Sequence, residues 1–227
     1  MRLDGVAAAI QDVASRFEIV VAKTDDELDE VFRLRYQVYC LERGFEPAVG
    51  GREIDRFDGN ASHVLIRHQE SRQAVGTARL VLPVGGDSGI EMPIDQICDA
   101  PILRRLPRDR TAEISRFALS KRYRTEGGAT GSLLRLMLTK AILALSGQIG
   151  LTHWCALMDP CLLRLLRASA IHFEPVGPLV EYHGFRQPAF ASIGDMLRRG
   201  EREQPLIWDF VTEGGTLWHA PPLRVAA

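Results

Sequence analysis

Apolar and polar positions alternate along this chain with the period of strands in some segments and of helices in others. Apolar, β-branched runs bounded by turn residues predict strands at residues 18–22, 62–67, 74–82, 113–120 and 152–158. Apolar stripes at helical spacing predict helices at residues 1–17, 24–41, 131–146, 160–168 and 193–199. The sequence contains no internal repeat, so we expect an N-terminal arm over residues 1–17 and a single α/β domain over residues 18–227.

Capping residues mark the start of two of these helices. The sequence Thr24-x-x-Glu27 is a capping box, in which each side chain satisfies a backbone N–H at the helix start. Asp159 is a favourable N-cap residue, and Pro160 after it suits the first helical position. Both helices are therefore expected to begin at these residues.

The composition is that of a globular protein without a strong overall field. Among the 227 residues, 46% are hydrophobic and 25% are charged, and the formal net charge is -1. These values exclude a disordered or collagen-like chain. They also give no general attraction to nucleic acid or to an anionic membrane, so we expect no nucleic-acid partner.

Cysteine usage and hydropathy bear on the compartment. The four cysteines form no C-x-x-C pair and no secretory signal precedes Asp4, so we expect reduced thiols and a cytoplasmic location. The most apolar stretch, residues 133–158, is interrupted by polar side chains, among them Arg135 and Lys140. A membrane span needs about 20 mainly apolar residues, so we expect no transmembrane segment.

Six charged residues lie inside apolar or turn-bounded segments, where an isolated charge is costly to bury. Three are acidic and three are basic, which suits a mutually paired network: Arg35, Asp55, Asp58, Arg79, Glu113 and Arg116. Such a network can be a structural set of salt bridges or the frame of a functional site.

In the strand that contains Glu113 the large apolar positions change parity. Ile114 is followed by Phe117, whereas a regular strand alternates faces at every residue. A bulge near Ser115 restores the register and places Glu113 and Arg116 on one face. A bulge also leaves a backbone N–H unpaired, and such a group can donate to a substrate carbonyl or to an oxyanion.

A glycine-rich turn follows this strand and fits the pattern R-x-x-G-x-A. It consists of Arg124, Gly127 and Ala129, with a second glycine at Gly128. Backbone N–H groups at such a turn can bind a phosphate, although many flexible turns match the pattern. The neighbouring Lys121 and Arg122 complete a small basic patch that is either a solvated surface or a binding surface.

Other chemistries find little support in the sequence. The six histidines show no metal-ligand spacing, and no nucleophile elbow or nucleotide P-loop occurs. We therefore expect no metal and no permanently bound cofactor.

Together these residues resemble the acyl-homoserine-lactone synthases and the related N-acyl amino acid synthases of the GNAT-like N-acyltransferase superfamily. The resemblance rests on Phe32 and Arg35 in the first helix, and on three further elements, which are Glu53-Ile54-Asp55-Arg56-Phe57-Asp58, Gly76-Thr77-Ala78-Arg79-Leu80 and Glu113 to Phe117. It implies a central, mostly antiparallel, twisted sheet flanked by helices and splayed at the bulge near Ser115.

Two departures concern the acceptor. The lactone synthases carry an arginine where this chain has Leu28 and a tryptophan where it has Val38, which argues against S-adenosylmethionine as the substrate. Residues 35–42 and 177–188 resemble instead the acyltransferases associated with PEP-CTERM/exosortase systems. The second segment contains Tyr182, His183 and Arg186, which are candidates for closing the acceptor pocket.

The resemblance implies transfer of a long-chain acyl group from an acyl carrier protein thioester to the amine of an amino acid or similar metabolite. Glu113 would act as the general base, and Arg116, Asp55, Asp58 and Arg79 would orient it and the acceptor. Acceptor contacts are expected from Phe32, Arg35, Ser115 and Phe117. The alternatives are a lactone synthase and a non-catalytic acyl- or carrier-binding module of an exosortase-type surface system.

The donor follows from the same resemblance. Lys121, Arg122 and Arg124 would meet the acidic surface of the acyl carrier protein, and Gly127, Gly128 and Ala129 would lie at its phosphopantetheine. Acyl-CoA remains an alternative donor, because the glycine-rich turn also suits a pyrophosphate. Apolar residues at helical spacing line either an acyl tunnel or ordinary core: Leu134, Met137, Leu138, Leu157, Leu163 and Leu166.

Overall fold

The computed structural model describes residues 10–82, 92–98, 101–125 and 128–217. The chain divides into two compact units, each built from two separate stretches of sequence. Unit 1 comprises residues 1–81 and 115–142, and unit 2 comprises residues 82–114 and 143–227. The single domain over residues 18–227 stays a prediction, and most of the N-terminal arm lies outside the described residues, which show helix at 10–14.

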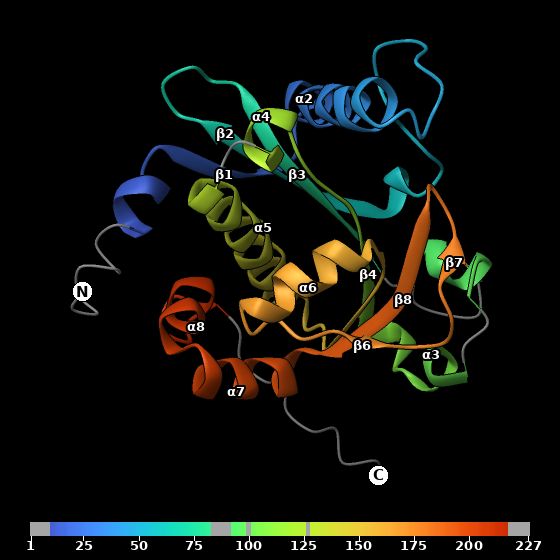
Figure 1. Cartoon of the computed structure of the whole chain (residues 1–227), viewed down its shortest axis with the longest axis vertical. Helices are drawn as coiled ribbons and strands as arrows, with labels where there is room; N and C mark the ends of the chain where they lie inside the picture. The colour runs from blue at the N-terminus through green and yellow to red at the C-terminus, as the bar shows by residue number, and fades with distance from the viewer. Residues whose placement is uncertain (1–9, 83–91, 99–100, 126–127, 218–227) are drawn as a thin grey trace. The chain divides into compact units, whose positions relative to one another are not determined.

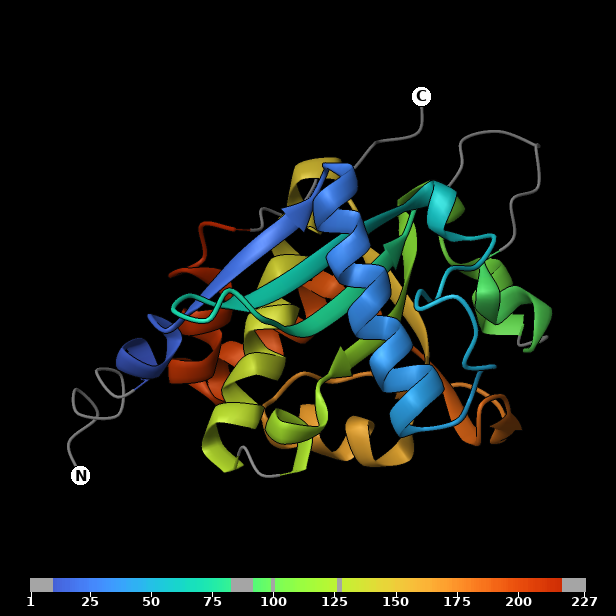
Figure 2. The ribbon, with the colours of Figure 1, turned by 90° about the horizontal axis from the view of Figure 1, so that it is seen from above.

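Unit 1 is an antiparallel meander covered by a helix. Strands β1 (Phe17–Ala22), β2 (Ala61–His68) and β3 (Ala74–Val81) pair in that order, and β2 and β3 form an antiparallel hairpin from the two strands predicted at residues 62–67 and 74–82. Helix α2 (Asp25–Arg35) crosses the face of these strands (Figure 2). Its apolar stripe is buried against the sheet in a core formed by Val31, Leu34, Val38, Leu65 and Ala118.

The start of α2 agrees with the sequence analysis, but its end does not. Thr24 and Glu27 form both hydrogen bonds of the capping box. The chain was expected to continue as a regular helix to about Leu41, whereas it passes into a π-helix, η1 (Tyr36–Glu42), directly after Arg35. The wider turn still buries Val38, and apolar spacing over seven residues does not distinguish the two kinds of turn.

Strand β4 (Thr111–Leu119) begins in unit 2 and ends in unit 1. Its irregularity lies at Arg116, whose φ of 48° is left-handed, one residue beyond the predicted bulge. In unit 1 the strand leads through Ser120 to α4 (Lys121–Thr125) and α5 (Gly128–Ile149). Gly131 lets α5 approach α4 closely, because a Cβ there would lie 2.3 Å from the carbonyl oxygen of Tyr123.

Unit 2 combines one parallel and several antiparallel pairings. The first residues of β4 pair in parallel with β5 (His153–Met158), and β5 pairs antiparallel with β8 (Phe185–Ser192). The short strands β6 (Glu174–Pro175) and β7 (Val180–Glu181) also pair with β8. The helices of this unit are α3 (Pro101–Arg105), α6 (Pro160–Ala168), α7 (Ile193–Glu203) and α8 (Pro205–Thr212), with 3₁₀ turns η3 (Pro93–Gln96) and η4 (Arg108–Arg110) (Figure 1).

The fold class agrees with the prediction. The strand order is β1-β2-β3-β4-β5-β8-β6, with β7 beside β8, in a mostly antiparallel sheet of eight strands. Helices α3, α4 and α8 were not predicted from the sequence, whereas the N-cap of α6 was, and the Asp159 carboxylate there accepts a hydrogen bond from the Cys161 N–H. The α/β class with a mixed, mostly antiparallel sheet is therefore confirmed.

Helix α5 bears on the membrane question. It has the length and composition that a bilayer span requires, and Arg135 and Lys140 are too few charges to exclude it on that basis. However, 61% of its most apolar window is buried inside the protein, as in the core helix of a folded domain.

Candidate functional site

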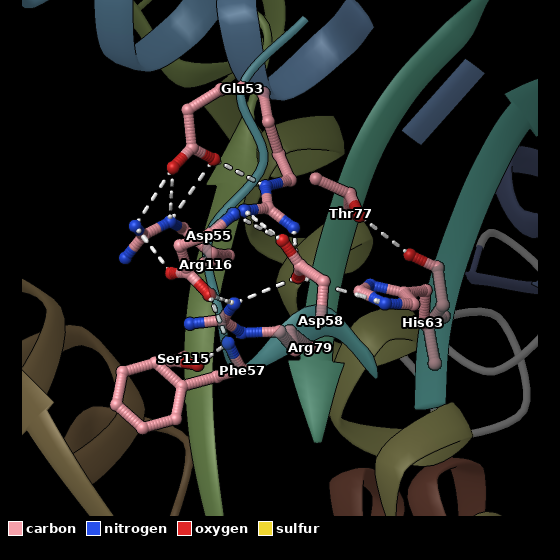
Figure 3. Close-up of polar contacts among 11 residues, drawn as sticks. Glu53, Asp55, Phe57, Asp58, His63, Thr77, Arg79, Ser115 and Arg116 are labelled. Atoms are coloured by element: carbon pink, nitrogen blue, oxygen red, sulfur yellow. Dashed lines mark hydrogen bonds and ion pairs between the residues drawn. The ribbon is translucent and has the colours of Figure 1, made fainter. Parts of the chain in front are cut away.

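Unit 1 contains a buried network of three arginines and three carboxylates. The arginines come from regular elements, Arg35 from the end of α2, Arg79 from β3 and Arg116 from β4. The carboxylates come from one loop and the 3₁₀ turn η2 (Asp58–Asn60) that follows it: Glu53, Asp55 and Asp58. Figure 3 shows Arg79 and Arg116 converging from two strands on the three carboxylates of the loop.

Asp58 lies at the centre of the network. Its carboxylate accepts hydrogen bonds from both terminal nitrogens of Arg35, at 2.6 and 3.2 Å, and from Nη1 of Arg79 at 2.8 Å. The backbone N–H of Asp55 donates to it as well, at 2.7 Å. Both oxygens of the Asp58 carboxylate thus accept hydrogen bonds, and the side chain is only 5% exposed.

Arg116 and Arg79 join the other two carboxylates. Arg116 donates to Glu53 through Nε and Nη2, and its Nη2 also donates to Asp55 at 2.9 Å. Arg79 donates to Asp55 at 2.6 Å and, through Nε, to the Ser115 hydroxyl at 2.9 Å. The left-handed backbone at Arg116 turns its side chain toward the loop, so the strand irregularity directly shapes the network.

The network is balanced in charge, which determines its protonation. Burial raises the pKa of each carboxyl, but the hydrogen bonds and charges of the arginines outweigh it. The pKa values of Glu53 and Asp55 are lowered, and that of Asp58 falls to about 2. All three are therefore ionised at neutral pH, and Asp55, with 24% of its side chain exposed, is the most accessible of them.

The sequence analysis named most of this network but missed two members. Glu53 was noted in the motif without a role, yet it is the carboxylate that bridges Arg35 and Arg116. His63, on β2, was considered only as one of the six histidines without metal-ligand spacing, and its position inside an apolar strand was the available signal. Its ring lies 5.6 Å from that of Phe32, and its Nε2 is 3.7 Å from a carboxylate oxygen of Asp58.

His63 predicts a pH dependence of stability. Burial is the main cause that lowers the pKa of His63 to about 4, and the charges of Arg35 and Arg79 lower it further. The negative charge of Asp58 acts in the opposite direction. The unfolded chain therefore takes up a proton on this histidine near pH 6.5 while the folded protein does not until about pH 4. We expect the free energy of unfolding to fall between these values, by about 3 kcal/mol.

Urea unfolding between pH 7 and pH 4.5 measures this effect. A His63→Gln variant should lose most of the slope, and a His68→Gln variant, changed near the end of the same strand, should keep it. An unchanged slope in His63→Gln would assign the dependence to other groups.

Two of the remaining predicted acceptor contacts in unit 1, Phe32 and Ser115, contact the network. Phe32, half-buried on α2, places its ring 5.4 Å from the Arg35 guanidinium. Ser115 is bonded to Arg79, and Phe117 is half-buried on β4. The structure therefore brings Phe32, Arg35 and Ser115 into contact with network members.

Glu113 belongs to unit 2, where it is 1% exposed. Its Oε2 accepts a hydrogen bond from the backbone N–H of Ile94 at 2.7 Å. Ile94 lies in η3, a turn between the strands predicted at residues 74–82 and 113–120, where no element was predicted. The buried carboxylate is thus held by a backbone donor from this segment, and its role as the general base stays a prediction.

The distinctive C-terminal segment has a local structural explanation. Tyr182 and His183 form the turn between β7 and β8, with His183 and Gly184 at left-handed φ values of 52° and 86°. The Tyr182 N–H donates to the Gly184 carbonyl, and the two rings lie 4.3 Å apart. Arg186 is on β8 opposite Val180. That these residues close an acceptor pocket stays a prediction.

The predicted carrier-binding residues differ in their surroundings. Lys121 and Arg122 are exposed on α4, whereas Arg124 donates to the Leu119 carbonyl and pairs with Glu42 at 2.9 Å. Gly128 and Ala129 begin α5. Gly127 lies outside the described residues.

The predicted acyl-tunnel residues lie on β5, α5 and α6. Leu134, Met137 and Leu138 are buried on α5, Leu166 is buried on α6, and Leu157 and Leu163 are half-buried. These positions suit core as well as a tunnel. Within the described part of the chain, no three His, Cys, Asp or Glu residues gather as a metal site would require.

Comparison with known proteins adds a family match. Residues 34–133 match the family model described as an acetyltransferase (GNAT) domain, a range that contains the entire charge network. No curated protein matches this sequence.

Solved structures share the fold at low sequence identity. The AHL synthase LasI is 19% identical with a TM-score of 0.59, covering 77% of this chain and 88% of its own. FeeM, an N-acyl amino acid synthase from uncultured soil microbes, is 16% identical with a TM-score of 0.56, covering 81% and 96%. The CoA-dependent acyl-homoserine lactone synthase BjaI is 20% identical with a TM-score of 0.58, covering 87% and 88%.

Proposed function

We propose that this chain, an acyltransferase of the GNAT type, moves a long-chain acyl group from an acyl carrier protein thioester to the amine of an amino acid or a similar small metabolite. The GNAT match over residues 34–133 supports the reaction class. The observation that supports an amino acid as the acceptor is the charge-balanced network, in which the partly exposed Asp55 lies beside Arg116. An amino acid carries both charges, so such a pair suits its two ends.

The chemistry asks little more of the protein than alignment, proton removal and charge stabilisation. A thioester is already activated, so no covalent enzyme intermediate is needed. Glu113 accepts a proton from the acceptor ammonium, and the free amine attacks the thioester carbonyl. An amide C–N bond forms, the C–S bond breaks, and the pantetheine sulfur leaves as the free thiol with the second proton of the amine.

Two further groups complete the proposal. A backbone N–H at the β4 irregularity donates to the oxyanion of the tetrahedral intermediate. The ionised network holds the acceptor without changing its own protonation, because the lowered pKa values of Asp55 and Asp58 keep both carboxylates charged at neutral pH. Rigid groups of this kind stabilise developing charge at little reorganisation cost.

A lactone synthase is the second candidate. The fold similarity to LasI and BjaI is as great as that to FeeM and favours it. Leu28 and Val38 argue against a lactone synthase, because they replace the arginine and the tryptophan of those enzymes. Val38 is 3% exposed and packs in the core of unit 1. A core position of this kind is unsuited to a direct substrate contact.

Mass spectrometry of product mixtures distinguishes these functions. The protein is incubated with a ladder of acyl carrier thioesters or the matching acyl-CoAs, and with the twenty amino acids or S-adenosylmethionine. We expect an N-acyl amino acid that requires the carrier thioester. An acyl-homoserine lactone would support the second candidate, and intact thioesters with retained carrier binding would favour a non-catalytic module.

A further inference from the structure

A groove of about 500 Å³ lies on the surface of unit 1, apart from the charge network. Three elements form it, α2, the turn between β2 and β3, and the segment from the end of β4 into α4. Its lining combines polar and apolar groups and consists of Glu30, Arg33, Leu34, Gln37, Arg72, Gln73, Ala74, Val75, Ser120, Arg122 and Tyr123. Each of the three elements contributes one arginine.

The single acid in the groove is already neutralised. Both oxygens of the Glu30 carboxylate accept hydrogen bonds from Arg67, at 2.7 and 2.8 Å. Arg67 does not line the groove, so the Glu30 carboxylate is occupied by a residue outside it. The arginines that line the groove therefore have no carboxylate partner within the lining. The groove therefore has a positive character.

The three arginines remain available to a partner. Arg33 pairs with Asp29 and Arg72 pairs with Glu18, yet 67% and 61% of their side chains stay exposed. Arg122 contacts the ring of Tyr123 and forms no ion pair with any carboxylate of the described chain. Exposed ion pairs such as Arg33–Asp29 and Arg72–Glu18 contribute little to stability, so these arginines can exchange partners.

We propose that this groove, defined by Arg33, Arg72 and Arg122, is the docking surface for the acidic face of the acyl carrier protein. The inference rests on the proposed function and replaces Arg124, which is held by Glu42, with arginines of two other elements. Guanidinium groups bind carboxylates in a bidentate way, and complementary charge accelerates encounter. Their distribution over three elements around an open groove suits several carboxylates of a protein surface better than one phosphate.

Binding of fluorescently labelled apo carrier protein, followed by anisotropy, tests the docking surface without any acyl transfer. In 50 mM salt we expect Arg122→Glu and Arg72→Glu each to weaken the affinity at least 10-fold. At 500 mM salt the difference should shrink, because exposed charges are screened. The matched control is Arg202→Glu, the same charge reversal at an exposed residue of α7, and it should leave the affinity unchanged.

A second measurement separates this inference from the proposed function. Acyl-pantetheine lacks the carrier protein, so its turnover by the wild type reports the proposed function independently of the docking surface. Equal affinities of Arg122→Glu and Arg202→Glu for the carrier would overturn the docking surface, even if acyl-pantetheine is turned over. Absence of carrier binding by the wild type would overturn it as well. If Arg122→Glu raised the KM for acyl-CoA and left the affinity for the carrier unaltered, the groove would be a phosphate site instead.

Discussion

Replacing Glu113 with Gln should lower kcat for acyl transfer by about 10²- to 10⁴-fold, the usual contribution of a general base. The side chain keeps its shape, and its amide oxygen can still accept the hydrogen bond from the Ile94 N–H. What the substitution removes is the ability to take a proton from the acceptor ammonium. The fold and carrier binding should therefore remain while the chemical step fails.

Single-turnover measurements over a pH range give the sharpest test of this role. At high pH a growing fraction of the acceptor is already the free amine, so the deficit of Glu113→Gln should become smaller. The matched control is Glu203→Gln, which changes an exposed carboxylate of α7 that pairs with Arg199 and His172. It should retain wild-type turnover. Equal turnover in Glu113→Gln and the wild type would remove Glu113 as the base.

The charge network shows how far a sequence can lead toward a site. Charged residues inside apolar segments identified Arg35, Asp55, Asp58, Arg79 and Arg116, because burying them requires partners. The sequence could not show which acid meets which arginine, since that depends on the path of the loop between Glu53 and Asp58. Glu53 took the bridging position that the sequence analysis did not assign to any residue.

Backbone departures from regular geometry were harder to locate. The change of parity in β4 predicted an irregularity within one residue of its position at Arg116. The π-helix at Tyr36–Glu42 left no comparable signal, because its apolar positions resemble those of an α-helix. The turn at Tyr182 and His183 was visible only as an unusual cluster of residues, since a left-handed histidine is not indicated by apolar spacing.

Replacing Asp58 with Asn should lower the free energy of unfolding by about 3–5 kcal/mol, as expected when one partner of a buried ion pair is removed. Asp58 accepts hydrogen bonds from Arg35, Arg79 and the Asp55 N–H. An asparagine keeps the volume but removes the negative charge that both arginines share, which leaves Arg35 with Glu53 and Arg79 with Asp55 alone. It also presents an NH₂ donor where only acceptors fit.

The surface of the same unit supplies a matched control for this prediction. Asp29 also bonds two arginines, Arg33 and Arg52, but both of these side chains are largely exposed, at 67% and 53%. Asp29→Asn should scarcely change the urea midpoint, because exposed ion pairs are weak. A similar midpoint shift in both variants would show that the network is not a major source of stability.

The dependence on acid gives an independent check on the same residue. The Asp58 pKa is about 2 in the folded protein and near 3.8 when unfolded, so its stabilisation is fully present above pH 3.8 and is lost as the pH falls toward 2. Asp58→Asn has no such proton to take up. The stability difference between the wild type and this variant should therefore narrow in acid, whereas a purely steric effect of the asparagine would persist at every pH.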